Sequence, residues 1–238
     1  MRTESYFISL EEKIAPGGRR KSTNIYLVNK GRFFAWKRIL DIVVSVLVIV
    51  FVLSWLTPVV ALLVFFDSRG PIFFLQRRVG REGVTFTCIK FRSMLLNADS
   101  DRLQAIRGDK RITFIGNFLR RSNVDELPQF INVLLGHMSI IGPRPHMYAD
   151  HYKFSSIVNG YEFRTLVRPG ITGLAQVRGF AGPALDMESI FGRYQWDAFY
   201  VRNASFFLDM RILKKTILQQ FMFWLKPIVG LFISKRRR

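Results

Sequence analysis

The sequence predicts an α+β protein, mostly helical, that attaches to a membrane as a monotopic protein. One observation is an apolar run from Ile42 to Phe66 without a charged residue, whereas a helix of about 20 residues already crosses the hydrocarbon core. A second is that 36 Lys and Arg against 17 Asp and Glu give a net charge of +19, although 49% of residues are hydrophobic. We therefore expect a re-entrant helix hairpin, a short β-hairpin, interfacial amphipathic helices and anionic partners.

The membrane segment has the features of a broken helix. Lys37 and Arg38 stand before it, and Arg77 and Arg78 stand after it, so the positive-inside rule places neither end outside. Pro58 lies inside the run, and an interior proline removes a helix hydrogen bond and favours a kink. We therefore favour a re-entrant helix broken near Pro58, with both ends cytoplasmic, over a straight crossing.

Two strands and a helix are expected next. Ile72 to Gln76 and Val84 to Phe91 are rich in aromatic and β-branched residues and are separated by Gly80-Arg81-Glu82-Gly83. This pattern is typical of a β-hairpin with a longer loop. We expect a helix from about Met94 to Ile106.

The C-terminal region carries apolar residues at helical spacing. They are Met210, Leu213, Ile217, Phe221 and Trp224. Such a stripe is typical of a basic amphipathic helix in the membrane interface, and equally of an ordinary helix packed on a core. The tail Lys235-Arg236-Arg237-Arg238 fits anionic membrane lipid.

Two adjacent carboxylates, Asp125 and Glu126, follow Arg120 closely in sequence. Because proline is tolerated in the first turn of a helix but not later, Pro128 predicts a helix from near Asp125 to Leu135. The pair is then either an ordinary helix cap or a chemical centre. A carboxylate can attack a phosphoryl group whose charge is neutralised, and Arg120 with a bound Mg²⁺ would provide this.

Arg144 stands between two prolines in Gly142-Pro143-Arg144-Pro145. A stiff backbone would present its guanidinium to a phosphate with little entropy left to lose, although a rigid surface turn has the same composition. The sequence contains no Gly-x-x-x-x-Gly-Lys phosphate loop and no Gly-x-Gly-x-x-Gly motif after a strand. Arginines are therefore the expected phosphate ligands.

Short motifs follow one another in a fixed order between about Lys37 and Thr216. They are Lys37–Asp41, Gly70–Phe74, Gln76–Gly80, Lys90–Met94, Arg111–Thr113, Asp125–Gln129, Met138-Ser139, Gly142–Pro145 and Arg168–Gly173. In this order they resemble the monotopic phosphoglycosyl transferases, the bacterial sugar transferases of the polyprenyl glycosylphosphotransferase type. Two positions depart from the family pattern: His137 replaces an Asp, and Ala181 stands where members that use glucose or galactose often carry arginine.

The resemblance implies the initiating step of exopolysaccharide, capsule or O-antigen synthesis, at the cytoplasmic face of the bacterial inner membrane. Asp125 would attack the β-phosphate of a UDP-sugar, release UMP and keep the phosphosugar, a hexose such as glucose or galactose, until undecaprenyl phosphate accepts it in a ping-pong reaction. Glu126 would position or deprotonate this acceptor, and Mg²⁺ would bind Asp125 and the diphosphate. The implied phosphate-binding cations are Lys90, Arg92, Arg120 and Arg144.

These expectations divide the chain into a leader (1–36), a re-entrant membrane helix (37–68), a cytoplasmic catalytic domain (69–216) and an amphipathic, basic tail (217–238). The expected partners are a UDP-sugar, undecaprenyl phosphate and anionic membrane lipid, with no nucleic acid, and a homodimer is left open. Two alternative functions remain compatible with the sequence. One is a basic membrane-surface module that recruits nucleic acid or acidic lipid, and the other is a membrane phosphohydrolase that passes the intermediate to water.

Overall fold

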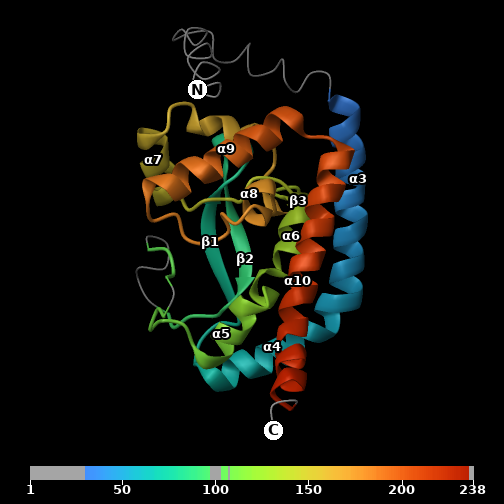
Figure 1. Cartoon of the computed structure of the whole chain (residues 1–238), viewed down its shortest axis with the longest axis vertical. Helices are drawn as coiled ribbons and strands as arrows, with labels where there is room; N and C mark the ends of the chain where they lie inside the picture. Colours follow the sequence, from blue (N-terminus) through green and yellow to red (C-terminus); the bar gives the residue numbers. More distant parts are fainter. Residues whose placement is uncertain (1–29, 97–102, 107, 236–238) are drawn as a thin grey trace.

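The computed structural model describes residues 30–96, 103–106 and 108–235, with side chains as far as residue 225. Helices are arranged around a two-stranded ribbon and a second small sheet, so the predicted α+β, mostly helical fold is confirmed (Figure 1). The expected leader as far as residue 29 and the tail residues 236–238 lie outside the described residues. In chain order the elements are α3 (Gly31–Val48), η1 (Ile49–Leu53), α4 (Ser54–Asp67), β1 (Phe73–Val79), η2 (Arg81–Gly83), β2 (Thr85–Phe91), α5 (Phe114–Arg121), η3 (Val124–Glu126), α6 (Gln129–Leu134), β3 (Ser139–Ile141), α7 (Tyr148–Ile157), η4 (Tyr161–Leu166), β4 (Gly170–Thr172), α8 (Leu174–Val177), α9 (Met187–Asn203) and α10 (Phe206–Lys235).

The apolar run forms one long, bent helix. α3, the π-helical turn η1 and α4 follow one another without interruption. In Figure 1, α3 runs along one side of the molecule and α4 turns across its lower end. The whole stretch, Gly31–Asp67, is long and apolar enough to cross a membrane, and only 17% of its most apolar window is buried against the rest of the chain. Its outer surface is therefore suited to lipid.

The bend has a local cause in the backbone. Pro58 lies in the second turn of α4, where its ring collides with the carbonyl of Ser54 and provides no N–H to it. The wider π turn comes directly before this point, and the N–H of Ser54 bonds to the carbonyl of Ile49. The Ser54 hydroxyl also donates to the carbonyl of Val50 at 2.5 Å. These two bonds satisfy the carbonyls of Ile49 and Val50 at the bend, as an apolar environment requires.

Three polar side chains tie α3 to the remainder of the molecule. Lys37 forms an ion pair of 2.6 Å with Asp209 of α10. Arg38 donates to the last two carbonyls of α6 at 2.6 and 2.9 Å. The buried Asp41 accepts a backbone N–H of β3 at 3.0 Å. The basic motif that precedes the apolar run therefore joins it to the folded domain.

The predicted β-hairpin is confirmed, and its first strand is longer than expected. β1 pairs antiparallel with β2 from Phe73 opposite Phe91 to Val79 opposite Thr85, so it continues beyond Gln76. Because side chains alternate along a strand, every second residue of β2 faces α6. The buried Cys88 lies in the core formed there.

The expected helix from Met94 to Ile106 is wrong where the structure describes the segment. Met94 forms an isolated antiparallel bridge with Ile112, and the N–H of Leu95 bonds to the carbonyl of Arg111 at 2.8 Å. Residues 103–106 are not helical, and residues 97–102 lie outside the described part of the chain. Pairing with a distant segment overrides a weak local helical preference.

The second half of the chain packs around the small parallel sheet of β3 and β4. Gly142 and Gly170 allow the segments at this sheet to approach closely, because a Cβ atom at either position would meet the backbone of the other segment. The main core joins the sheet to α8, α9 and α10. It contains Ile141, Val167, Leu174, Val177, Tyr200, Val201, Ala204 and Ile212.

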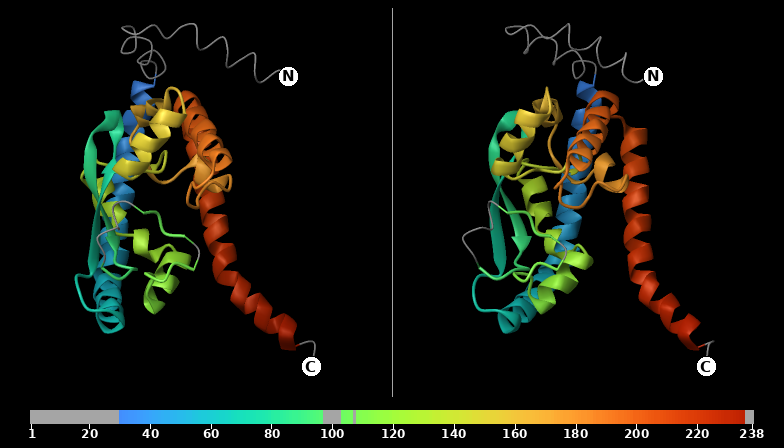
Figure 2. Two further views of the ribbon diagram at one scale, coloured as in Figure 1. Left: turned by 90° about the vertical axis from the view of Figure 1, so that its left-hand side faces the viewer. Right: turned by 60° about the vertical axis from the view of Figure 1, so that its left-hand side comes forward.

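α10 is an ordinary packed helix in its first part and leaves the body of the molecule in its second part (Figure 2). Ile212 is buried in the main core, so the predicted core packing is confirmed for that part. Of the predicted apolar stripe, Leu213 also packs against this core, whereas Ile217, Phe221 and Trp224 are 46–59% exposed. This exposed face leaves the interfacial interpretation open for the remainder of the helix.

Replacement of Asp41 by alanine is expected to lower the free energy of unfolding by about 1–3 kcal/mol, because the bonded N–H of β3 would lose its acceptor. Asp41→Asn keeps an acceptor oxygen and should retain most of the stability. Thermal unfolding of the purified protein in detergent measures both. Ile39→Ala, which shortens an exposed side chain on the same helix, is the control, and equal melting temperatures for Asp41→Ala and this control would contradict the assignment.

Candidate active site

Asp125 and Glu126 lie together in a single 3₁₀ turn, η3. Asn123, directly before it, has a left-handed backbone conformation with φ of 57° that redirects the chain after α5. Val124 and Leu127 pack into the core cluster formed with the bent helix. The apolar residues on either side of the carboxylates therefore fix the turn against α4.

The helix expected to begin near Asp125 begins at Gln129 instead. Pro128 is its N-cap residue, and no side chain caps this helix end. Neither carboxylate therefore caps a helix, although both lie in the first turn of η3. Both carboxylates are available for other partners.

One amide side chain holds α6 against β2. Asn132 Oδ1 accepts the N–H of Ile89 at 2.9 Å, and its Nδ2 donates to the carbonyl of Thr87 at 2.7 Å. The amide thus bonds to the free edge of β2 as a neighbouring strand would. Asn132 is buried, and its two bonds set the position of β2 relative to the turn that precedes α6. Lys90 of β2 is thereby brought to Glu126.

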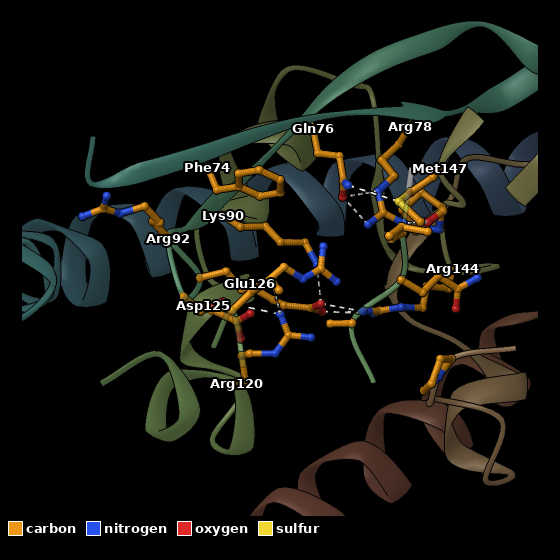
Figure 3. Close-up of a pocket in the computed structure, with 18 of the residues that line it drawn as sticks. Phe74, Gln76, Arg78, Lys90, Arg92, Arg120, Asp125, Glu126, Arg144 and Met147 are labelled. Atoms are coloured by element: carbon orange, nitrogen blue, oxygen red, sulfur yellow. Dashed lines mark hydrogen bonds and ion pairs between the residues drawn. The ribbon is translucent and has the colours of Figure 1, made fainter. Parts of the chain in front are cut away.

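Glu126 is clamped by two cations (Figure 3). Lys90 Nζ lies 2.7 Å from Glu126 Oε1, and Arg144 donates to both carboxylate oxygens, at 2.6 and 3.1 Å. Burial alone would raise the pKa of Glu126, but the charges and hydrogen bonds of Arg144 and Lys90 hold it well below its ordinary value. Glu126 is therefore ionised and a very weak base.

Two other arginines hold the backbone around Arg144 through hydrogen bonds to its carbonyl groups. Arg164 donates to the carbonyl of Arg144 at 2.5 Å and is itself paired with Asp197 at 2.8 Å, with both side chains at most 3% exposed. Arg78 donates to the carbonyl of Pro145 at 3.0 Å. Because Gly142, Pro143 and Pro145 are also buried, the alternative of a rigid surface turn is wrong.

Asp125 has the opposite surroundings to its neighbour. It is only 6% exposed, and among the described residues no hydrogen bond or ion pair reaches its carboxylate. Burial and then the charge of Glu126 raise its pKa to about 6, although Lys90, Arg120 and Arg144 act in the other direction. Asp125 is thus ionised at neutral pH but poorly stabilised, as a nucleophile or metal ligand should be.

The structure brings three of the four predicted phosphate-binding cations to the pair. Lys90, Arg120 and Arg144 point toward it in Figure 3, and Arg92 points away. Arg92 is 2% exposed and donates to two backbone carbonyls after α4, at 2.5 and 2.6 Å. Arg92 therefore holds the end of α4, and it also lines the pocket that contains the carboxylate pair.

The carboxylate pair opens into a pocket of about 280 Å³. Its wall includes three arginines that were not predicted as site residues, Arg78, Arg111 and Arg193, and a third carboxylate, Asp150. Arg78 and Arg111 belong to the ordered motifs, so the sequence could have marked them as site residues. Arg193 and Asp150 come from α9 and α7, and no local pattern in the sequence marks them.

Asp125 suits a divalent cation that binds together with substrate. Among the described residues, no three His, Cys, Asp or Glu side chains gather around one position, so the described side chains do not form a complete metal cage. Mg²⁺ commonly takes one or two carboxylates and completes its shell with substrate phosphates and water. Asp125 fits this mode because its oxygens are unpaired, whereas those of Glu126 are occupied by two cations.

A cluster of cations around an unpaired carboxylate is typical of enzymes that act on phosphoryl groups. Comparison with known proteins makes this specific. The chain belongs to the bacterial sugar transferase family, whose model matches residues 32–223. The family resemblance of the ordered motifs is confirmed.

Several relatives have names that state an activity. A protein of Klebsiella pneumoniae named UDP-glucose:undecaprenyl-phosphate glucose-1-phosphate transferase is 41% identical over 188 residues, which are 79% of this chain and 40% of the relative. The Exopolysaccharide production protein PSS of Rhizobium leguminosarum is 45% identical over 68% of this chain and 83% of its own length. An Aeromonas hydrophila UDP-N-acetylgalactosamine-undecaprenyl-phosphate N-acetylgalactosaminephosphotransferase is 42% identical over 76% of this chain and 42% of its own length. The chain thus spans less than half the length of two of these relatives.

The two carboxylates should respond oppositely to neutralisation. Since the folded pKa of Asp125 lies above its unfolded value of 3.8, the stability cost of its charge grows as pH rises from about 4 to about 6 and stays constant above that, so Asp125→Asn should stabilise the protein by about 2 kcal/mol at pH 8. Glu126→Gln should destabilise it by about 2–3 kcal/mol, because Lys90 and Arg144 lose their buried counter-charge.

Melting temperatures in detergent with a chelator test this contrast at about pH 8 and again at about pH 4, where the gain from Asp125→Asn should vanish. Glu82→Gln in the exposed hairpin turn is the control and should leave the melting temperature unchanged. A lower melting temperature for Asp125→Asn at the higher pH would contradict the assigned environment.

Proposed function

We propose that this protein transfers a sugar 1-phosphate from a UDP-sugar to undecaprenyl phosphate, and so begins the synthesis of an exopolysaccharide or a related glycan. The observation that carries the proposal is the division of the carboxylate pair, in which Glu126 is neutralised by two cations and Asp125 is buried and unpaired. The names of the relatives supply the substrate class. Because those names include glucose, galactose and N-acetylgalactosamine, the sugar is a hexose or its derivative.

In the first proposed step, a carboxylate oxygen of Asp125 attacks the β-phosphorus of the UDP-sugar. The bond between this phosphorus and the bridging oxygen breaks, UMP leaves with that oxygen, and the phosphosugar stays on Asp125 as an acyl phosphate. Lys90, Arg120 and Arg144 would stabilise the charge that develops on the phosphate oxygens. Their convergence on the pair supports this assignment.

Mg²⁺ is the proposed cofactor, with Asp125 as its ligand from the protein. Bound with the diphosphate, the ion would neutralise phosphate charge. The carboxylate of Asp125 would enter this arrangement already desolvated, because its environment excludes most water. The absence of competing hydrogen bonds from the described residues to its oxygens supports the assignment.

In the second proposed step, a phosphate oxygen of undecaprenyl phosphate attacks the same phosphorus. The bond to Asp125 breaks, its carboxylate is regenerated, and the lipid-linked sugar diphosphate leaves. Of the two roles expected for Glu126, its low pKa favours positioning over proton abstraction. Glu126 would hold Lys90 and Arg144 at the acceptor phosphate instead of taking a proton from it.

We further propose that the bent helix enters and leaves the membrane on the cytoplasmic side, with the exposed face of α10 lying in the interface on anionic lipid. The bend at η1, the exposed apolar surface of α3 and α4, and the basic residues at both ends support this arrangement. The phosphate end of undecaprenyl phosphate would then reach the pocket from the lipid head-group region. A surface module that only binds lipid or nucleic acid would have no use for an unpaired, buried Asp125.

Incubation of the purified protein with Mg²⁺ and a panel of radiolabelled UDP-sugars, without lipid acceptor, should leave label on the denatured protein. Asp125→Asn should abolish this label, because the attacking oxygen is lost. Addition of undecaprenyl phosphate should move the label into lipid. Release of free sugar phosphate with no lipid product would establish the phosphohydrolase instead.

With Mg²⁺ and UDP-sugar well below saturation, the rate of this labelling should rise about tenfold per pH unit below about pH 6 and level off above it, because under these conditions it reports the free protein, in which the pKa of Asp125 is raised to about 6. Rapid quench at several pH values measures the rate. Glu82→Gln is the control and should show the same profile, and a rate that falls as pH rises through this range would contradict the role of Asp125.

Single cysteines placed at Lys30 and at Arg81 should both be protected from a thiol reagent confined to the periplasm. Both should react after permeabilisation. The native Cys88 gives a low background because it is 1% exposed. Labelling of one position alone in intact cells would establish a straight crossing of the membrane.

A further inference from the structure

A third carboxylate lies in the arginine-rich pocket without an assigned role. Asp150, in the first turn of α7, lines the pocket wall. It is partly exposed and forms no ion pair with any described residue, although Arg78 and Arg193 lie close enough to act on it electrostatically. A negative charge in a pocket built for phosphates weakens phosphate binding unless it faces another part of the ligand.

Metal binding alongside Asp125 does not explain Asp150. Among the described residues no three potential ligands gather around one position. Asp150 comes from α7 and bonds to Gln104, whereas Glu126 comes from η3 and pairs with Lys90 and Arg144. Asp150 and the carboxylate pair therefore have different partners in the pocket.

Two polar side chains lie in the same part of the pocket. Gln104 bonds to the Asp150 side chain and accepts the N–H of Ala184 through Oε1 at 3.1 Å. Arg193 is 5% exposed, its Nη2 donates to the carbonyl of Gly182, and its Nη1 lies 3.4 Å from His146 Nε2. Its Nε has no hydrogen-bond partner among the described residues. This part of the pocket thus offers a carboxylate acceptor, an amide and a buried guanidinium with an unused donor.

These groups match the chemistry of neighbouring hydroxyl groups. A sugar hydroxyl both donates and accepts hydrogen bonds, so a carboxylate takes its protons while amide and guanidinium N–H groups bond to its oxygens. The position also fits the reacting end of the substrate. Arg78 and Arg193 lie close enough to interact electrostatically with both Arg144 and Asp150. Arg144 is one of the cations that would hold the β-phosphate, and this phosphate carries the hexose.

We propose that Asp150, Gln104 and Arg193 form a subsite that binds the hydroxyl groups of the hexosyl unit of the sugar nucleotide. The inference rests on the proposed sugar-phosphate transfer and names the residues that would select the sugar. Asp150 accepts hydrogen bonds from the hexose, and Gln104 and Arg193 donate to it. The ribose of the nucleotide is the other source of such hydroxyls, and the experiment separates the two.

The test compares wild type, Asp150→Asn and Gln104→Ala as full-length proteins in detergent with the best UDP-hexose of the panel. Asp150→Asn should lower kcat/KM for UMP release by about 10- to 100-fold, because a buried hydroxyl loses a charged acceptor. Gln104→Ala should lower it in the same direction by a smaller factor and provides a second variant if the first folds poorly. Glu188→Gln, exposed on α9, is the control and should leave kcat/KM unchanged.

Binding of UDP, which lacks the hexose, decides between hexose and ribose. The Kd of UDP should stay within about twofold of wild type in Asp150→Asn if the hexose is the ligand. An equal weakening of UDP and UDP-hexose would overturn the proposal in favour of the ribose. Deoxy analogues give a further check, because removal of the contacted hydroxyl should harm the wild type and leave Asp150→Asn almost unaffected.

The failure of this inference differs from the failure of the proposed function. An active wild type with unchanged kcat/KM in folded Asp150→Asn would overturn the subsite alone. A wild type that forms no lipid-linked product from any UDP-sugar would overturn the proposed function, and the subsite with it.

Discussion

The clamp on Glu126 is the interaction on which the rest of the site depends. A carboxylate buried beside another carboxylate is costly unless cations compensate it. Lys90 and Arg144 provide this compensation to Glu126 from two different segments, and Asp125 is left with burial and repulsion. In the proposed reaction, the stability lost at Asp125 is the counterpart of its reactivity, because groups that act in catalysis are often destabilised by their charged surroundings.

The clamp in turn requires three segments that are distant in sequence to meet within hydrogen-bond distance. Asn132 sets the distance between β2 and α6. The ion pair of Arg164 with Asp197 supports the loop that carries Arg144. The carboxylate turn itself packs on the bent helix, so the apolar helix is part of the architecture of the candidate site as well as the proposed membrane attachment.

The sequence predicted the features that depend on local patterns. The β-hairpin follows from aromatic and β-branched residues around a glycine-bounded loop, and the mostly helical fold follows from long apolar periodicities. The features that the sequence did not reveal depend on distant contacts. The segment from Met94 pairs with Ile112. Arg92 has the same charge and the same motif context as Lys90, yet it donates to backbone carbonyls. Asp150 is marked by no motif, because only the tertiary fold carries α7 to the pocket.

The polar contacts of α3 with α6, β3 and α10 have a mechanical consequence in the proposed membrane arrangement. Lys37, Arg38 and Asp41 join the helix rigidly to the elements that carry the site, so the depth of the helix in lipid fixes the height of the pocket above the hydrocarbon. The position of the helix in the bilayer then sets the distance between the pocket and the membrane surface. A thinner or thicker bilayer would tilt the whole enzyme, and the mismatch would alter access of the lipid acceptor while leaving the geometry around Asp125 unchanged.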